Sequence, residues 1–147
     1  MEEGAEEEKV DTHGLKLQEC DYICDNIYLG PEGSAIDLSY LKSLNISRIL
    51  ICASQCDPVF SSPNYGITYL KLDLVDVAEQ SLEPFYAPAH AFICSSPSNT
   101  LVHCRSGVSR SASLVISYLI HHYRLSAVDA YYYVKTRRLC VLPNLGF

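Results

Sequence analysis

A short apolar segment, a loop of small residues and a long apolar segment follow one another at residues 101–120, and this succession constrains the fold more than any other feature. Leu101 and Val102 predict a very short strand. From Arg110 onwards, apolar residues lie nearly all round a helical projection, which predicts a central, buried helix. A strand that leads within a few residues into a buried helix is typical of α/β proteins.

The same alternation of strands and helices runs through the rest of the chain. Strands are predicted at residues 22–29, 48–52 and 67–74, where apolar residues form continuous runs or alternate with polar ones. Helices are predicted at residues 36–44, at 81–92 with Ser81 as the cap, and at 126–138, where Asp129 follows Ser126 at the spacing of a helix start. We therefore expect one α/β domain with a mostly parallel central sheet flanked by helices on both faces.

The first twenty residues are expected to lie outside this domain, which would span residues 21–147. Large apolar side chains are almost absent from the stretch, and its acidic side chains crowd together: Glu2, Glu3, Glu6, Glu7, Glu8 and Asp11. Such a composition cannot bury enough apolar surface to order the chain. Residues 1–20 are predicted to be a disordered, solubilising tail, with a docking segment for a basic partner as the alternative.

Charge and cysteine content limit the partners and the compartment. A formal charge of −6 and a pI near 5.2 argue against general binding to nucleic acid or to anionic membranes, which requires clustered Lys and Arg. No apolar run approaches the roughly 20 residues of a membrane span, and no signal peptide is evident. The seven cysteines are odd in number and spread through apolar segments, which predicts reduced thiols. We expect a cytoplasmic protein, with the nucleus left open as a second compartment.

The loop between the predicted strand and the buried helix has the composition of an anion site. Cys104 and Arg110 lie at its two ends, and Ser106, Gly107 and Ser109 between them are small. Such a loop can curl so that its N–H groups point inward, beside the positive end of the helix and a bidentate guanidinium. In that field a thiol pKa falls from about 8.5 to roughly 3.5–7.5. Cys104 is therefore predicted to be a nucleophile directed at phosphorus.

The segment HCRSGVSRS at residues 103–111 resembles the HCxxGxxRS signature loop of the protein tyrosine phosphatase superfamily, and its dual-specificity branch in particular. Further similarity lies in YLG at residues 28–30, RIL at 48–50, LVHC at 101–104 and PN at 143–144. The resemblance covers roughly residues 21–147. It implies the cysteine-phosphatase fold, and it identifies that stretch as a dual-specificity phosphatase catalytic domain.

This resemblance assigns a role to each residue of the loop. Cys104 would form a phosphocysteine intermediate, Arg110 would bind the equatorial phosphate oxygens, and the hydroxyl of Ser111 would assist departure of the thiolate. His103 would orient the loop by hydrogen bonding. The implied phosphate-binding residues are Arg105, Ser106, Gly107, Val108, Ser109 and Arg110. No cofactor and no metal are implied.

A carboxyl group must protonate the leaving oxygen of a phosphoester. Asp76 lies seven residues after Tyr69, which is a strand tyrosine, and similar phosphatases place their general acid there. Asp76 is therefore the predicted acid. Asp73 and Glu79 are the alternatives, because they lie near the same strand end.

The predicted function is hydrolysis of phosphotyrosine, and of phosphoserine and phosphothreonine, on phosphorylated protein substrates. The alternative is a phosphopeptide-binding scaffold with little turnover. The absence of lysine from the loop disfavours phosphoinositide substrates.

Two CxxxC pairs, formed by Cys20, Cys24, Cys52 and Cys56, leave a structural zinc as a minor possibility. His121 and His122 are adjacent on a helix and therefore make poor joint ligands. The oligomeric state is left open.

Overall fold

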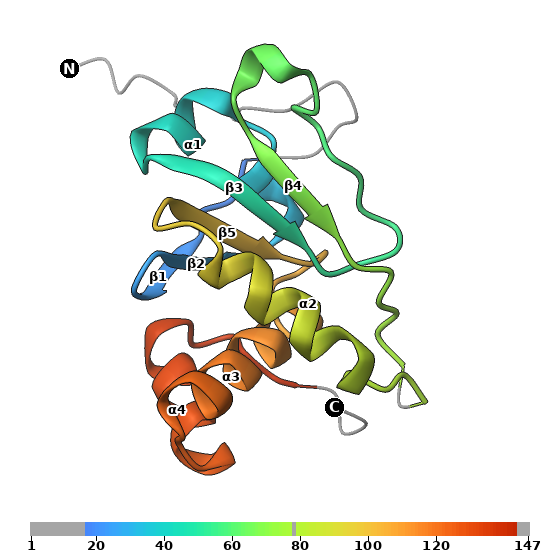
Figure 1. Ribbon diagram of the computed structural model, residues 1–147, viewed down its shortest axis with the longest axis vertical. Helices are drawn as coiled ribbons and strands as arrows, with labels where there is room; N and C mark the ends of the chain where they lie inside the picture. Colours follow the sequence, from blue (N-terminus) through green and yellow to red (C-terminus); the bar gives the residue numbers. More distant parts are fainter. Residues whose placement is uncertain (1–16, 78, 144–147) are drawn as a thin grey trace, which may run out of the picture.

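A five-stranded sheet forms the centre of the molecule in the computed structural model, which describes residues 17–77 and 79–143 (Figure 1). The strands are β1 (Asp21–Cys24), β2 (Ile27–Gly30), β3 (Ile46–Ile51), β4 (Thr68–Lys71) and β5 (Asn99–His103). Their spatial order is β1-β2-β5-β3-β4. Only β1 is antiparallel to its neighbour, so the predicted mostly parallel α/β sheet is confirmed.

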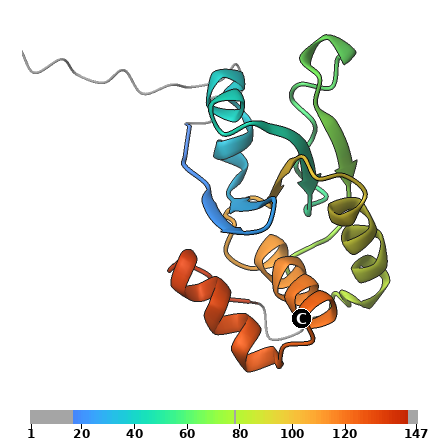
Figure 2. The same ribbon diagram turned by 60° about the vertical axis from the view of Figure 1, so that its left-hand side comes forward.

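Helices cover both faces of this sheet. The short α1 (Leu38–Ser43) packs against β3 on one face, preceded by the 3-10 helix η1 (Glu32–Ala35). The helices α2 (Glu83–Cys94), α3 (Arg110–Tyr123) and α4 (Ala127–Arg137) lie together on the other side (Figures 1 and 2). A second 3-10 helix, η2 (Pro63–Tyr65), precedes β4. The prediction of helices on both faces is therefore confirmed.

The helix α3 is the centre of the core. All residues from position 110 to position 119 are buried, as the apolar sequence predicts. It contacts β5 and β2, while α2 and α4 also pack against it. The predicted cap of the next helix is also present, because the hydroxyl of Ser126 accepts a hydrogen bond of 3.1 Å from the Asp129 N–H.

Three predictions of local structure are wrong in detail. Residues 22–29 form a hairpin of two strands rather than one strand, because Asp25 adopts φ 51° at the turn, a conformation that Asp tolerates better than most residues. The strand predicted at 67–74 ends at Lys71, after which the chain leaves the sheet. The helix cap is Leu82 rather than Ser81, whose hydroxyl accepts from the Glu83 N–H at 3.3 Å.

The predicted acidic tail falls mostly in residues 1–16, which lie outside the described residues. Its disorder and the boundary at residue 20 therefore stay predictions. Within residues 17–77 and 79–143, no helix has both the length and the apolar character that crossing a membrane requires.

The segment after α4 crosses the surface toward the loop that joins β5 to α3. Its Val141 is fully buried, whereas Leu139 and Leu142 on either side are 76% and 67% exposed. The buried side chain of Val141 therefore anchors this segment beside the loop that joins β5 to α3.

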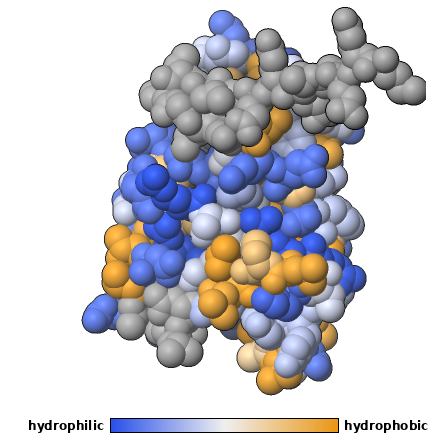
Figure 3. Space-filling model, turned by 180° about the vertical axis from the view of Figure 1, so that it is seen from behind, coloured by the Kyte–Doolittle hydropathy of each residue, from blue (hydrophilic) through white to orange (hydrophobic). Residues whose placement is uncertain are grey.

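Seen from behind, hydrophilic side chains cover the middle of the molecule and apolar ones gather mainly below it (Figure 3).

Candidate active site

The loop at residues 104–109 lies at the carboxyl end of β5, between β5 and the first turn of α3. Gly107 adopts φ +68° there, and a Cβ on it would lie 2.5 Å from the carbonyl carbon of Gly30 and 2.6 Å from its oxygen. Only glycine fits this turn, because an L side chain would be strained and would also collide with the end of β2. The glycine thus lets the loop curl tightly against the sheet.

Replacing Gly107 by alanine is expected to lower the free energy of unfolding by more than the roughly 1–3 kcal/mol that a left-handed backbone conformation alone costs a residue with a side chain. The clash of the new Cβ with the end of β2 adds to this cost. The displaced loop should lower kcat/KM by about 10²-fold. Gly66 is a matched control, since it has the same φ of +68° with no atom within 4 Å of a built Cβ. Urea unfolding and the rates of phosphomonoester hydrolysis that the loop predicts, measured for both variants, test this prediction, and equal losses in the two variants would contradict it.

The carbonyl oxygens of the loop are turned outward by partners beyond the loop. The hydrogen bonds run from Glu32 N to Arg105 O (2.9 Å), from Arg138 Nη2 to Ser106 O (2.9 Å), from Arg138 Nε to Gly107 O (2.9 Å) and from Leu142 N to Val108 O (2.8 Å). Because the carbonyls are held on the outside, we expect the N–H groups to face the centre of the loop, as that of Gly107 does toward the Cys104 Sγ at 3.2 Å. Consecutive inward N–H groups form a nest for an anion.

Arg138 is a residue that sequence reasoning missed. It is only 9% exposed, and a 3.0 Å ion pair with Asp21 holds its guanidinium between β1 and the loop. From there it donates to the carbonyls of Ser106 and Gly107. In the sequence it is one of two arginines at a helix end, and no local pattern indicates its contact with a loop 31 residues earlier.

The Cys104 thiol lies at the centre of the loop and is 1% exposed. Its Sγ accepts a hydrogen bond from the Gly107 N–H at 3.2 Å and lies 3.1 Å from the Ser111 hydroxyl. Burial raises the pKa of this thiol. Hydrogen bonds from the hydroxyl and backbone of Ser111 and from Gly107, with the charge of Arg110, outweigh burial, so its pKa lies below the ordinary cysteine value.

The Arg110 guanidinium is buried beside the thiol, and one of its donors is unpaired. Its Nη1 donates to Gln55 Oε1 at 2.7 Å and to the Leu74 carbonyl at 3.2 Å, and the side chain is 5% exposed. Its buried Nε has no hydrogen-bond partner among the described residues. An unpaired buried donor is costly, so the arrangement suits an anionic ligand that would accept from it. Gln55, which sequence reasoning also missed, fixes the guanidinium.

The Asp76 carboxylate reaches the loop from the segment after β4. Its Oδ1 accepts a hydrogen bond of 3.0 Å from the Ser109 hydroxyl, and the side chain is otherwise exposed. Asp73 and Glu79 are exposed as well, but within the described part of the chain neither forms a hydrogen bond to the loop. Of the three carboxylates considered from sequence, Asp76 is therefore the one joined to the loop.

His103 is buried at the end of β5, and its Nδ1 lies 3.0 Å from the Cys104 carbonyl oxygen. Burial lowers the pKa of this histidine to about 4, although the hydrogen bond to that carbonyl opposes the shift. The ring is therefore neutral at physiological pH and carries one N–H. Because a carbonyl only accepts, Nδ1 is the protonated nitrogen and donates to it. This contact fixes the peptide at the start of the loop.

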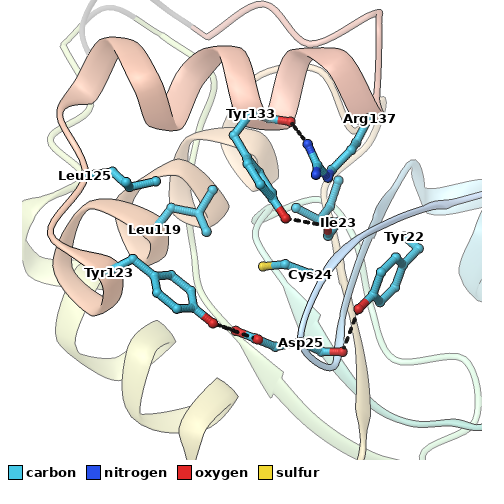
Figure 4. Close-up of a pocket in the computed structure, with 9 residues that line it drawn as sticks. All are labelled: Tyr22, Ile23, Cys24, Asp25, Leu119, Tyr123, Leu125, Tyr133 and Arg137. Carbon is cyan, nitrogen blue, oxygen red and sulfur yellow. Dashed lines mark hydrogen bonds between the residues drawn. The ribbon is translucent and has the colours of Figure 1, made fainter.

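A cavity of about 880 Å³ lies at the opposite end of the sheet, among β1, the end of α3 and α4 (Figure 4). Figure 4 shows Tyr123 directed at the Asp25 carboxylate and Tyr133 directed at the backbone of Ile23. No residue of the loop at 104–109 lines it. The cavity is thus separate from the anion nest.

The four cysteines of the CxxxC pairs do not meet as metal ligands. Cys24, Cys52 and Cys56 are buried and Cys20 is half-buried, all with free thiols. Among residues 17–77 and 79–143, the grouping of side chains able to hold a metal does not include any of them. The structural zinc on these cysteines is therefore not supported.

Comparisons with known proteins agree on one family. The family model described as "Dual specificity phosphatase, catalytic domain" matches residues 27–147. The Protein phosphatase Slingshot homolog of Xenopus laevis is 37% identical over 124 residues, which are 82% of this chain and 18% of that protein. The Serine/threonine/tyrosine-interacting protein of Mus musculus is 33% identical over 137 residues, 88% of this chain and 61% of that protein. The chain spans less than two thirds of either relative.

A solved structure has the same fold. The crystal structure of a human tyrosine phosphatase-like serine/threonine/tyrosine-interacting protein superposes with a TM-score of 0.80 at 32% identity. The match covers 86% of this chain and 89% of that one. The fold and the family therefore agree with the geometry of the loop.

Proposed function

The chain belongs to the dual-specificity phosphatase family, and from this premise we propose that it hydrolyses phosphotyrosine, and also phosphoserine and phosphothreonine, on phosphorylated proteins. The observation that carries the proposal is the Cys104 thiol, whose pKa is lowered, at the centre of inward-facing N–H groups beside the unpaired Nε of Arg110. A nucleophile and donors for a tetrahedral dianion thus share one loop. A cysteinyl-phosphate intermediate is general for the family.

In the first step the Cys104 thiolate attacks phosphorus, and the bond from phosphorus to the substrate oxygen breaks. The leaving oxygen takes a proton from the Asp76 carboxyl group, which the Ser109 hydroxyl holds against the loop. Negative charge on the equatorial oxygens is met by the loop N–H groups and the Arg110 guanidinium. The hydrogen bonds that Arg110 donates to the Gln55 Oε1 and to the Leu74 carbonyl supply the orientation of that guanidinium.

In the second step Asp76, now a carboxylate, accepts a proton from a water molecule whose oxygen attacks the phosphocysteine. The sulfur–phosphorus bond breaks, and the electron pair returns to Cys104 as a thiolate. The Ser111 hydroxyl, 3.1 Å from Sγ, donates a hydrogen bond to the departing sulfur. Inorganic phosphate leaves, and the nucleophile is restored.

Asp76→Asn is expected to lower kcat for an alkyl phosphate by about 10²-fold or more, because a poor leaving group needs the proton. For an activated aryl phosphate, whose leaving group is stable as an anion, the loss should be far smaller. Asp73→Asn is the matched control and should affect neither substrate strongly. Equal losses on both substrates for Asp76→Asn, or the selective loss in Asp73→Asn, would move the role to another carboxylate.

The test of the proposed function is phosphate release from a phosphotyrosine peptide and a phosphothreonine peptide, both measured with a metal chelator. Release from the phosphotyrosine peptide is expected in chelator, since no residue of the mechanism requires a metal. The ratio of the two rates sets the specificity. Release that depends on added metal would contradict the cysteine mechanism.

A phosphopeptide-binding scaffold is the second candidate, because two of the similar proteins carry "interacting protein" in their names. The complete set of Cys104, Arg110, Ser111 and Asp76 favours turnover instead. Peptide binding by the wild type without phosphate release would support the scaffold.

We further propose that the protein acts on phosphorylated signalling proteins in the cytoplasm.

A further inference from the structure

We propose that His90, Cys94 and His122 form a Zn²⁺ site that joins the carboxyl ends of α2 and α3. His90 and Cys94 are four residues apart on α2 and therefore lie on one face of that helix. His122 comes from the last turn of α3. The ligand atoms of the three side chains all lie within 4.8 Å of one another.

The spacing is close to that of a tetrahedral zinc site. Zinc bonds of about 2.3 Å to sulfur and 2.0–2.1 Å to nitrogen place neighbouring ligand atoms roughly 3.4–3.6 Å apart. Cys94 Sγ already lies 3.7 Å from His90 Nε2. Cys94 and His122 are exposed and His90 is half-buried, so small side-chain rotations can close the remaining separations. The free site is accessible to an ion from solvent.

Two tyrosines restrict the orientation of the imidazoles. The His122 ring stacks on Tyr118 at a centroid distance of 4.9 Å and meets the edge of Tyr123 at 4.8 Å. The His90 ring packs against the same Tyr118 at 5.5 Å. Both tyrosine hydroxyls donate to Asp25, which fixes the two rings in turn. Ligands whose supporting residues are already held lose less freedom on binding a metal.

The charge and the ligand types favour zinc. Cys94 and His122 line a surface cavity of about 400 Å³ together with Asp25, whose carboxylate attracts a cation. Two imidazoles and one thiolate are zinc ligands, and a water molecule would complete four-coordination. On binding, the Cys94 thiol loses its proton to solvent and a Zn–S bond forms.

The site is remote from the phosphatase chemistry. It lies at the carboxyl end of α3, whereas Arg110 begins that helix at the opposite end. Zinc would therefore link α2 to α3 and stabilise the fold without touching the reacting groups. The inference does not depend on the proposed function, because phosphate release and metal binding are measured separately.

The experiment is a Co²⁺ titration of the untagged 147-residue chain carrying Cys104→Ser, which removes a competing thiolate. One Co²⁺ per chain is expected, with thiolate-to-cobalt charge-transfer absorption that Zn²⁺ abolishes by displacement. In the same background, Cys94→Ser and His122→Gln should each weaken binding by at least about tenfold. Cys140→Ser, another exposed cysteine, and His121→Gln, the adjacent histidine, are the matched controls and should bind as before.

Thermal unfolding separates loss of the site from loss of the fold. Without metal, all variants are expected to unfold near the same temperature. Saturating Zn²⁺ should raise that temperature for the parent and the two controls but not for Cys94→Ser or His122→Gln. Absence of the charge-transfer band in the parent, or undiminished binding in Cys94→Ser, would overturn the proposal.

Discussion

Replacing Cys104 by serine is expected to reduce hydrolysis of a phosphotyrosine peptide by at least about 10⁴-fold, the scale found when a catalytic nucleophile is removed. Serine keeps the size and the hydrogen bonds of the thiol, but its hydroxyl is not ionised in the field that lowers the pKa of Cys104. The loop, Arg110 and Asp76 stay in place. Binding of the phosphopeptide should therefore survive the loss of turnover.

The measurement pairs single-turnover phosphate release with equilibrium binding of the same peptide. Cys56 gives the control, because it is also fully buried, while burial raises its pKa to about 12 and keeps it a thiol. Cys56→Ser should retain turnover if the fold survives, which its melting temperature checks. Substantial turnover in Cys104→Ser would contradict the cysteinyl-phosphate mechanism.

Arg110→Lys is expected to lower kcat/KM by about 10³-fold, although the positive charge is kept. The guanidinium of Arg110 is oriented by Gln55 and the Leu74 carbonyl, so that Nε remains for the phosphate. An ammonium group cannot satisfy the two anchors and also present a planar pair of donors. The loss should fall mainly on kcat, because the planar guanidinium matches the planar equatorial oxygens of the transition state better than the tetrahedral oxygens of the substrate.

Arg48→Lys is the matched control for this prediction. Arg48 is also a buried arginine, but it donates to Ser95 and lies over the Phe92 ring, away from the loop. Its substitution should lower the melting temperature and leave kcat nearly unchanged. If Arg110→Lys loses stability as Arg48→Lys does but keeps its activity, the role of Arg110 would be structural.

The parts of the fold that could be predicted are those that local pattern specifies. The continuous apolar stretch after Arg110 predicted α3, and the spacing of Ser126 and Asp129 predicted the start of α4. The alternation of strands and helices predicted the parallel sheet. The hairpin at residues 21–30 escaped prediction because a two-residue turn leaves the apolar run almost uninterrupted, and only the left-handed Asp25 reveals it.

What the sequence determined by itself about the site was its chemistry. Cys104 and Arg110 lie at the two ends of one short loop, so residue type and spacing were enough to predict a nest for a tetrahedral anion. The roles of these residues, and of Asp76 and Ser111, stay proposals until the variants are measured. Cys104, Arg110 and Ser111 lie in the loop or next to it in the sequence. A single hydrogen bond from Ser109 joins Asp76 to the loop.

Only the tertiary structure decided how that loop is held. Arg138 binds loop carbonyls 31 and 32 residues away, and Gln55 binds Arg110 across 55 residues. His122 gains His90 and Cys94 as neighbours only because α2 packs against α3. The periodicity of apolar side chains indicates which face of a helix or strand is buried, but it does not indicate which distant element packs against that face. Contacts across long separations in sequence depend on the packing of whole helices and strands, and no local pattern contains them.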